Sequence, residues 1–208
     1  SLPPLPPTPL IDVEPTSEPE LVGSFMMHDG KKKTHVISVG DPTGVNYSYD
    51  LNQGTVLQVW RGEFLNVTEM WYERGEPQTA TSMGAAVKFT DKINVGIVSD
   101  QKAPLPDTLI KPNDLLYKGY SLDGAGYPTF SYLYKNVMLK DSFIPLDGAR
   151  GIRRSFSISN APVAGVLLLR LAEGNNIMEV SDNLFAVDDQ RYYVQVIASG
   201  ANKPFLRS

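Results

Sequence analysis

The sequence predicts an all-β fold, a large antiparallel two-sheet β-sandwich with an extended Pro-rich N-terminal arm. Three observations support this prediction. Short runs rich in β-branched and aromatic residues alternate with Gly, Pro, Asn and Asp. No segment of a dozen residues has the apolar spacing of an amphipathic helix. The 42% hydrophobic content of the 208-residue chain is enough to form a substantial core.

The first twenty residues contain seven prolines and no aromatic residue. This composition favours an extended, polyproline-like chain over a packed core. We therefore predict that residues 1–20 form a linker or arm and that residues 21–208 form a single β-sandwich domain. The chain starts without an initiator methionine or an export signal, which indicates a piece of a larger precursor.

Alternating apolar residues between turn signals predict the strands of this domain. The predicted strands are 21–28, 33–39, 45–51, 55–61, 66–73, 84–89, 93–98, 116–122, 128–135, 137–144, 151–159, 164–171, 176–181, 184–187 and 191–198. Phe130, Tyr132 and Tyr134 share one face of their strand, as expected for a sheet that is buried on one side. The segment 103–117 is the longest predicted irregular connection.

Residues that tolerate positive φ separate several predicted strands and indicate an antiparallel, meandering layout. These turns are predicted at 52–54, 123–126, 147–148 and 188–189.

Composition excludes several chemistries. Without cysteine the chain has no disulfide, thiolate metal site, cysteine nucleophile or covalent c-type haem attachment. The 19 basic and 23 acidic residues are well mixed, so neither a nucleic acid nor an anionic membrane is an expected partner. No apolar run approaches the length of a membrane span.

The two histidines flank a basic turn and are weak candidates for a metal or catalytic pair. If a four-residue loop, 30–33, closes the hairpin, His28 lies opposite His35 with Cβ atoms about 5 Å apart. A metal would need a third ligand, and only Asp29 is close in sequence. A loop one residue shorter removes the pairing. An ordinary hairpin is the stronger interpretation, with His35 donating a ring hydrogen bond that orders the neighbouring loops.

The segment 59–77 carries the candidate substrate-binding residues. Aromatic rings beside carboxylates and guanidinium groups are typical of carbohydrate sites. The candidates are Trp60, Trp71, Tyr72, Glu69, Glu73 and Arg74. On a regular strand, Glu69, Trp71 and Glu73 would share one face. In the competing interpretation, Trp60 belongs to the core and Arg74 pairs with a nearby carboxylate.

No catalytic residue is predicted. The carboxylates of a glycosidase lie about 5 to 10 Å apart. Glu69 and Glu73 would be about 13 Å apart along a strand, so they fit this requirement poorly. The sequence also lacks a nucleophile elbow, a phosphate-binding glycine loop and a zinc-hydrolase motif.

Four stretches together resemble a β-sandwich accessory module of exported multidomain proteins that carry c-type cytochrome domains and sugar-dehydrogenase-like propellers. They are FMMHDGKKKTHVISVG, GVNYSYDLNQGTVLQVWRGEFLNVTEMW, YKGYSLDGAGYPTFSYLY and GIRRSFSIS, and the resemblance covers residues 21–198. The architecture is also similar to the galactose mutarotase-like sandwiches, which bind carbohydrate. The resemblance implies a periplasmic or extracellular location, and a haem held by a partner domain or subunit and not by this chain.

The expected function is therefore that of a noncatalytic module that docks to a cytochrome or dehydrogenase propeller in a larger electron-transport assembly. A carbohydrate-binding or carbohydrate-active β-sandwich is the alternative, and a purely structural spacer is a third possibility.

Overall fold

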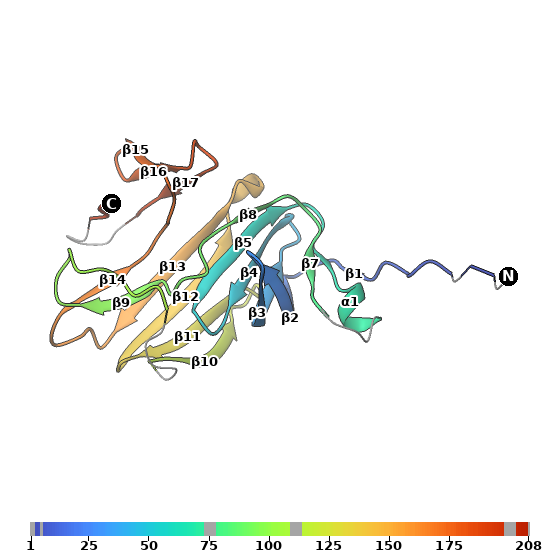
Figure 1. Ribbon diagram of the computed structural model, residues 1–208, viewed down its shortest axis with the longest axis horizontal. Helices are drawn as coiled ribbons and strands as arrows, with labels where there is room; N and C mark the ends of the chain where they lie inside the picture. Colours follow the sequence, from blue (N-terminus) through green and yellow to red (C-terminus); the bar gives the residue numbers. More distant parts are fainter. Residues whose placement is uncertain (1–2, 5, 73–77, 109–113, 198–202, 208) are drawn as a thin grey trace.

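The computed structural model describes residues 3–4, 6–72, 78–108, 114–197 and 203–207 (Figure 1). Regular structure in these residues is almost entirely β-strand and forms five sheets with antiparallel pairing. The all-β prediction is confirmed. The described residues contain three more sheets than the two expected, because short strands beside the larger sheets pair separately.

Two larger sheets form the centre of the molecule. One has the order β2 (Glu20–His28), β3 (Lys31–Gly40), β4 (Val45–Asp50), β5 (Thr55–Arg61) and β8 (Ala86–Lys88). The other has the order β10 (Leu115–Leu122), β11 (Pro128–Tyr134), β12 (Val137–Pro145) and β13 (Ile152–Ser159).

Aromatic side chains fill the space between these two sheets. Tyr49 of β4 stacks on Phe130 of β11 with ring centroids 4.4 Å apart. Phe143 of β12 contacts both Tyr47 and Tyr49. Every second residue of β11 is buried in this core, as the alternation in the sequence predicts.

A second core covers the opposite face of the five-stranded sheet. Val36 and Val39 of β3 belong to different cores because residues three apart on a strand face opposite sides. The second core is closed by β1 (Asp12–Val13), β6 (Leu65–Asn66), β7 (Thr81–Ser82) and the single helical turn α1 (Thr68–Trp71). The five-stranded sheet is thus packed on both faces.

Part of the predicted linker contributes to this second core. The peptide N–H of Ile11 donates to Oγ1 of Thr68, and the Glu14 carboxylate accepts from the peptide N–H of Phe64 at 2.8 Å. Ile11 and Val13 also pack against the core. The described residues before Ile11 are exposed, and Figure 1 shows them extending away from the sheets.

Two small sheets complete the fold. The first pairs β9 (Val95–Val98) with β14 (Val166–Leu169), and the second has the order β15 (Ile177–Ser181), β16 (Leu184–Val187) and β17 (Tyr192–Gln195). The ring of Phe89 contacts that of Tyr192 edge-on, which ties the second small sheet to the body of the protein. A 3-10 turn, η1 (Asp147–Ala149), joins β12 to β13.

The predicted strand 66–73 was wrong. Its pairing stops at Asn66, and α1 follows from Thr68. The Asn66 side chain accepts a hydrogen bond from the peptide N–H of Thr68, which turns the chain out of the strand. One helical turn is too short to produce a recognisable apolar period. The segment 103–117 is irregular as far as it is described up to Asp114, and β10 begins at Leu115.

Candidate functional site

The hairpin that carries the histidines closes with a two-residue turn. Asp29 and Gly30 both have positive φ, and His28 pairs with Lys31. Neither of the loop lengths considered from the sequence occurs, and His28 does not lie opposite His35. Asp-Gly is a strong sequence signal for the two-residue turn, because both of its residues tolerate positive φ.

The two histidines have different environments. His28 is fully buried, and its Nε2 donates to the carbonyl oxygen of Phe89 at 2.8 Å. His35 is exposed on β3. His28 thus joins β2 to the segment after β8, while His35 is accessible to solvent.

The imidazole of His35 makes two side-chain contacts through Nδ1. Its Nδ1 lies 3.1 Å from the amide nitrogen of Asn52. The hydroxyl of Thr34 also lies 2.9 Å from Nδ1. Through the contact with Asn52, His35 joins β3 to the turn that follows β4.

The basic run after the turn, residues 31–33, is only partly exposed to solvent. Lys33 is largely buried, and its ammonium nitrogen lies 2.7 Å from Oδ2 of Asp91 and 3.6 Å from Oδ2 of Asp50. Lys31 is exposed and lies 3.4 Å from the same oxygen of Asp91. The hydrogen bond from Lys33 is the main reason why the pKa of Asp91 is lowered.

Trp60 lies in the second core. Only 2% of its surface is exposed, and its indole N–H donates to the carbonyl oxygens of Glu63 and Phe64. Its ring also stacks on that of Phe64. Trp60 therefore belongs to the core, as the competing interpretation of the sequence expected, and it is not available to a ligand.

The other aromatic candidates are exposed. Trp71 and Tyr72 at the end of α1 expose 60% and 55% of their surface. Glu69 is held in the structure, because one of its carboxylate oxygens accepts from both the peptide N–H and the hydroxyl of Thr79. Glu73 and Arg74 lie outside the described residues. Since α1 is a helical turn, the predicted strand face shared by Glu69 and Trp71 does not exist.

An open groove of about 480 Å³ connects this segment with the exposed histidine. The pairing of β2 and β3 is irregular between Ser24 and Met26, and a β-bulge of this kind redirects side chains. The groove lies over this irregularity. It is lined by Gly23, Ser24, Phe25, Thr34, His35, Val36, Ile37, Leu51, Met70 and Gln78.

A charged network around the fully buried carboxylate of Asp141 lies at the first core, and the sequence analysis did not predict it. The guanidinium of Arg154 donates to both carboxylate oxygens of Asp141, at 2.8 and 2.5 Å. Tyr49 donates its hydroxyl to the same carboxylate at 2.9 Å. Burial, followed by the nearby charge of Asp141, raises the pKa of Tyr49 well above its usual value. The phenol is therefore a hydrogen-bond donor at neutral pH.

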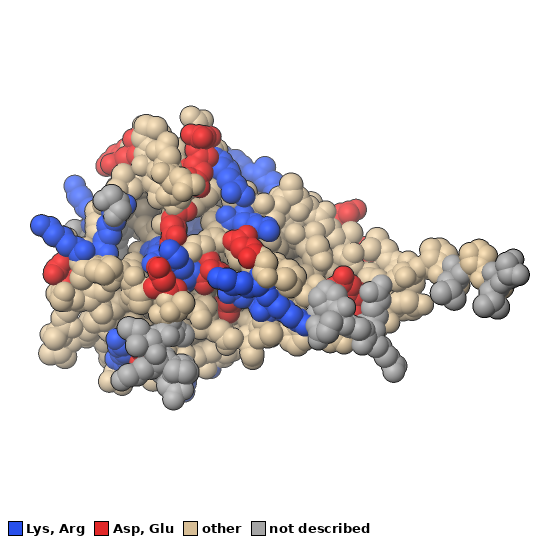
Figure 2. Space-filling model, in the orientation of Figure 1, with Lys and Arg blue, Asp and Glu red and all other residues tan. Residues whose placement is uncertain are grey.

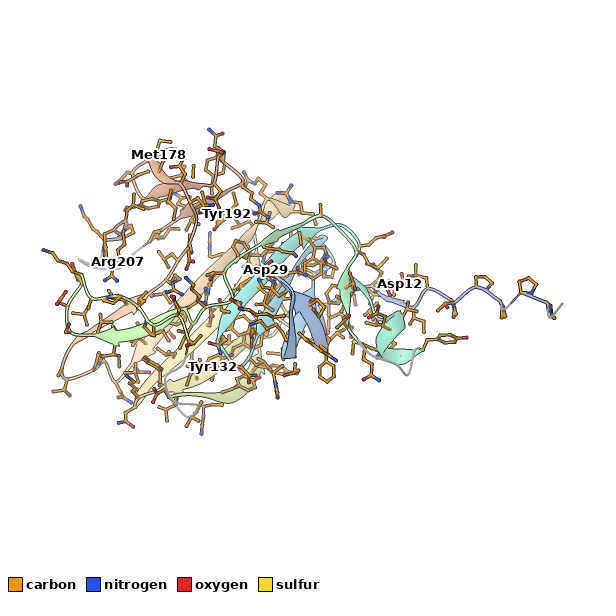
Figure 3. The ribbon with its side chains drawn as sticks, in the orientation of Figure 1. Asp12, Asp29, Tyr132, Met178, Tyr192 and Arg207 are labelled. Atoms are coloured by element: carbon orange, nitrogen blue, oxygen red, sulfur yellow. The ribbon has the colours of Figure 1, made fainter. Side chains whose placement is uncertain are left out.

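The sheet formed by β15, β16 and β17 has an apolar outer face. Register places Met178, Ala186 and Tyr193 in one cross-strand row of this face. Met178 and Tyr193 expose 56% and 52% of their surface. Figure 3 shows Met178 on the outer side of the sheet and Tyr192 on the side that faces the larger sheets.

The described residues contain no group of three potential metal ligands. None of their helices has the length and apolar character needed to cross a bilayer. On the face shown in Figure 2, acidic and basic side chains are interspersed. Comparisons with family models, curated proteins and solved structures found no significant match.

Proposed function

We propose that this chain is a noncatalytic, periplasmic or extracellular β-sandwich module that docks to a c-type cytochrome or a dehydrogenase propeller in a redox assembly. In this proposal the partner holds the haem, and the two larger sheets act as the rigid scaffold. The choice of partner rests on the sequence resemblance. The outer face of β15, β16 and β17 is the observation that supports docking.

This docking face is defined by Met178, Leu184, Tyr193 and Gln195, which share one side of the sheet with the buried Ala186. None of them is charged, so a partner can cover the face without desolvating an ion. Contiguous exposed apolar side chains commonly mark protein interfaces.

The surrounding region also has very little core of its own. Of the described residues beyond position 160, only Phe185, Ala186 and Val187 are buried. A small sheet with so few buried side chains gains little stability from its own packing. Contact with a partner would bury the outer face and stabilise the sheet.

The test is a calorimetric titration of the purified chain with a c-type cytochrome or propeller domain from the same reading frame or gene cluster. The double variant Met178→Glu/Tyr193→Glu places two carboxylates on the docking face and should weaken binding at least about tenfold. Leu122→Glu, at an exposed position of β10, is the matched control and should bind like the wild type. Absence of wild-type binding, or unchanged binding by the double variant, contradicts the proposal.

A further inference from the structure

We infer that two copies of this chain associate through β13, which joins their four-stranded sheets into one continuous antiparallel sheet. β13 is the last strand of its sheet and, among the described residues, it pairs with β12 alone (Figure 1). The backbone groups on its other edge are a template for a further strand. This inference is independent of the docking proposal, because the docking face lies on the sheet formed by β15, β16 and β17.

The other edges of the two larger sheets are covered, short or interrupted. The peptide N–H of Ala80 donates to the carbonyl oxygen of Phe25, which covers part of the outer edge of β2. β8 has only three residues. In β10 the pairing is irregular between Tyr117 and Gly119, and the exposed Lys118 lies at this irregularity. Bulges and lysines are common devices that prevent an edge from pairing with another chain.

β13 lacks these devices. Its eight residues pair with β12 in a regular register from Ile152 to Ser159, and they include neither proline nor glycine. A regular edge of this length can form a complete antiparallel ladder with a second strand. Because the opposite edge of the sheet is interrupted at β10, association through β13 closes as a dimer and does not continue as a filament.

The two faces of β13 differ in polarity. On the inner face, Arg154 donates to the Asp141 carboxylate and Phe156 packs against the first core. Ile158 has the same orientation but exposes 46% of its surface. The outer face carries only small or polar side chains, all of them exposed: Arg153, Ser155, Ser157 and Ser159. A strand that pairs with β13 must therefore be mainly apolar on one face and polar on the other.

A second copy of β13 meets this requirement. In an antiparallel pair, a twofold axis perpendicular to the joined sheet keeps the two inner faces on the same side. Opposite residues must share a face, so the axis passes beside one residue of each strand. With the axis at Phe156, the two Phe156 rings lie opposite each other, and Ser155 lies opposite Ser157 of the second copy. Aromatic pairs and hydroxyl pairs of this kind stabilise a sheet.

This register also separates the charges. Arg154 lies opposite Ile158 of the second copy, which is then covered, and Arg153 lies opposite Ser159. An axis at either arginine would place two guanidinium groups directly opposite each other, and β13 contains no carboxylate to compensate them. The pairing centred on Phe156 avoids this repulsion and keeps nearly the whole strand in the ladder.

The inference is tested by sedimentation equilibrium of the full chain. Edge pairing buries a small interface, so we expect a dimer with a dissociation constant of about 1–100 µM. Ser155→Lys/Ser157→Lys places lysines opposite each other and should weaken dimerisation at least about tenfold. Both serines are exposed, so urea titration should show an unchanged monomer fold. Leu116→Lys/Ser121→Lys adds the same charge at exposed positions of β10 and is the matched control, which should dimerise like the wild type.

A charge-swap experiment identifies the pairing strand. Ser155→Glu/Ser157→Glu should also dimerise poorly alone, because like charges again lie opposite each other. Mixed with the lysine variant of β13, it should form a heterodimer in which each lysine lies opposite a glutamate. The inference is overturned if the wild type stays monomeric up to about 500 µM or grows beyond a dimer. It is also overturned if the lysine variant dimerises like the wild type, or if the mixture shows no association.

Discussion

Replacing Arg154 by Met should strongly destabilise the fold while preserving most of the side-chain volume. Asp141 is fully buried and accepts three hydrogen bonds, two of them from Arg154 and one from Tyr49. The substitution leaves a buried carboxylate with a single protein donor. Removing one partner of a buried ion pair costs about 3–5 kcal/mol.

The free energy of unfolding can be measured by urea titration, with the fluorescence of buried Trp60 as the signal. Lys140→Met on the same strand as Asp141 is the matched control, because Lys140 is exposed and its replacement should change stability by less than about 0.5 kcal/mol. Tyr49→Phe should fall between these variants, with a loss of about 1.5–3 kcal/mol for one hydrogen bond to a charged group. If Arg154→Met unfolds within about 1 kcal/mol of the wild type, the network does not stabilise the core as we infer.

Two further predictions concern stability at other positions. Asp91→Asn should cost about 1 kcal/mol at pH 7 and progressively less in acid. Its folded pKa is lowered chiefly by Lys33, so the stabilisation is present above the unfolded pKa of about 3.9 and is lost as the pH falls through the folded pKa. A pH-independent difference in unfolding free energy from the wild type would contradict this. Gly40→Ala should cost about 1–3 kcal/mol, because the new Cβ would lie 2.5 Å from the ring of Phe64. Gly23→Ala, where nothing lies within 4 Å, is its control in the same urea titration, and equal stabilities would refute the steric explanation.

Local patterns were sufficient to predict most strands. The alternation in YPTFSYLY matches the burial of β11, and the turn at 123–126 lies where the β10–β11 connection needs it. Both signals depend on residues that are neighbours in sequence. The fold class could therefore be inferred before any tertiary contact was known.

Features that depend on register or on a single turn could not be predicted in the same way. Asp141 occupies the same strand face as Leu139 and Phe143, so alternation alone indicates a buried charge in need of a partner. Its partner, Arg154, is defined only by the pairing of β12 with β13. The short helix α1 similarly reversed the expected geometry around Trp71, although the prediction that this residue is a candidate ligand contact stays untested.

The positions of the groove and of the docking face follow from the packing of the five-stranded sheet on both of its faces. Because the sheet is packed on both faces, its central residues are unavailable to ligands, and binding surfaces must lie at its edges or on added elements. The groove occurs at the edge strand β2, where the ladder to β3 is irregular. The docking face occurs on a small sheet outside the cores. Changes at the docking face should therefore leave the packing of the two cores intact, which is why substitutions at Met178 and Tyr193 can separate binding from folding.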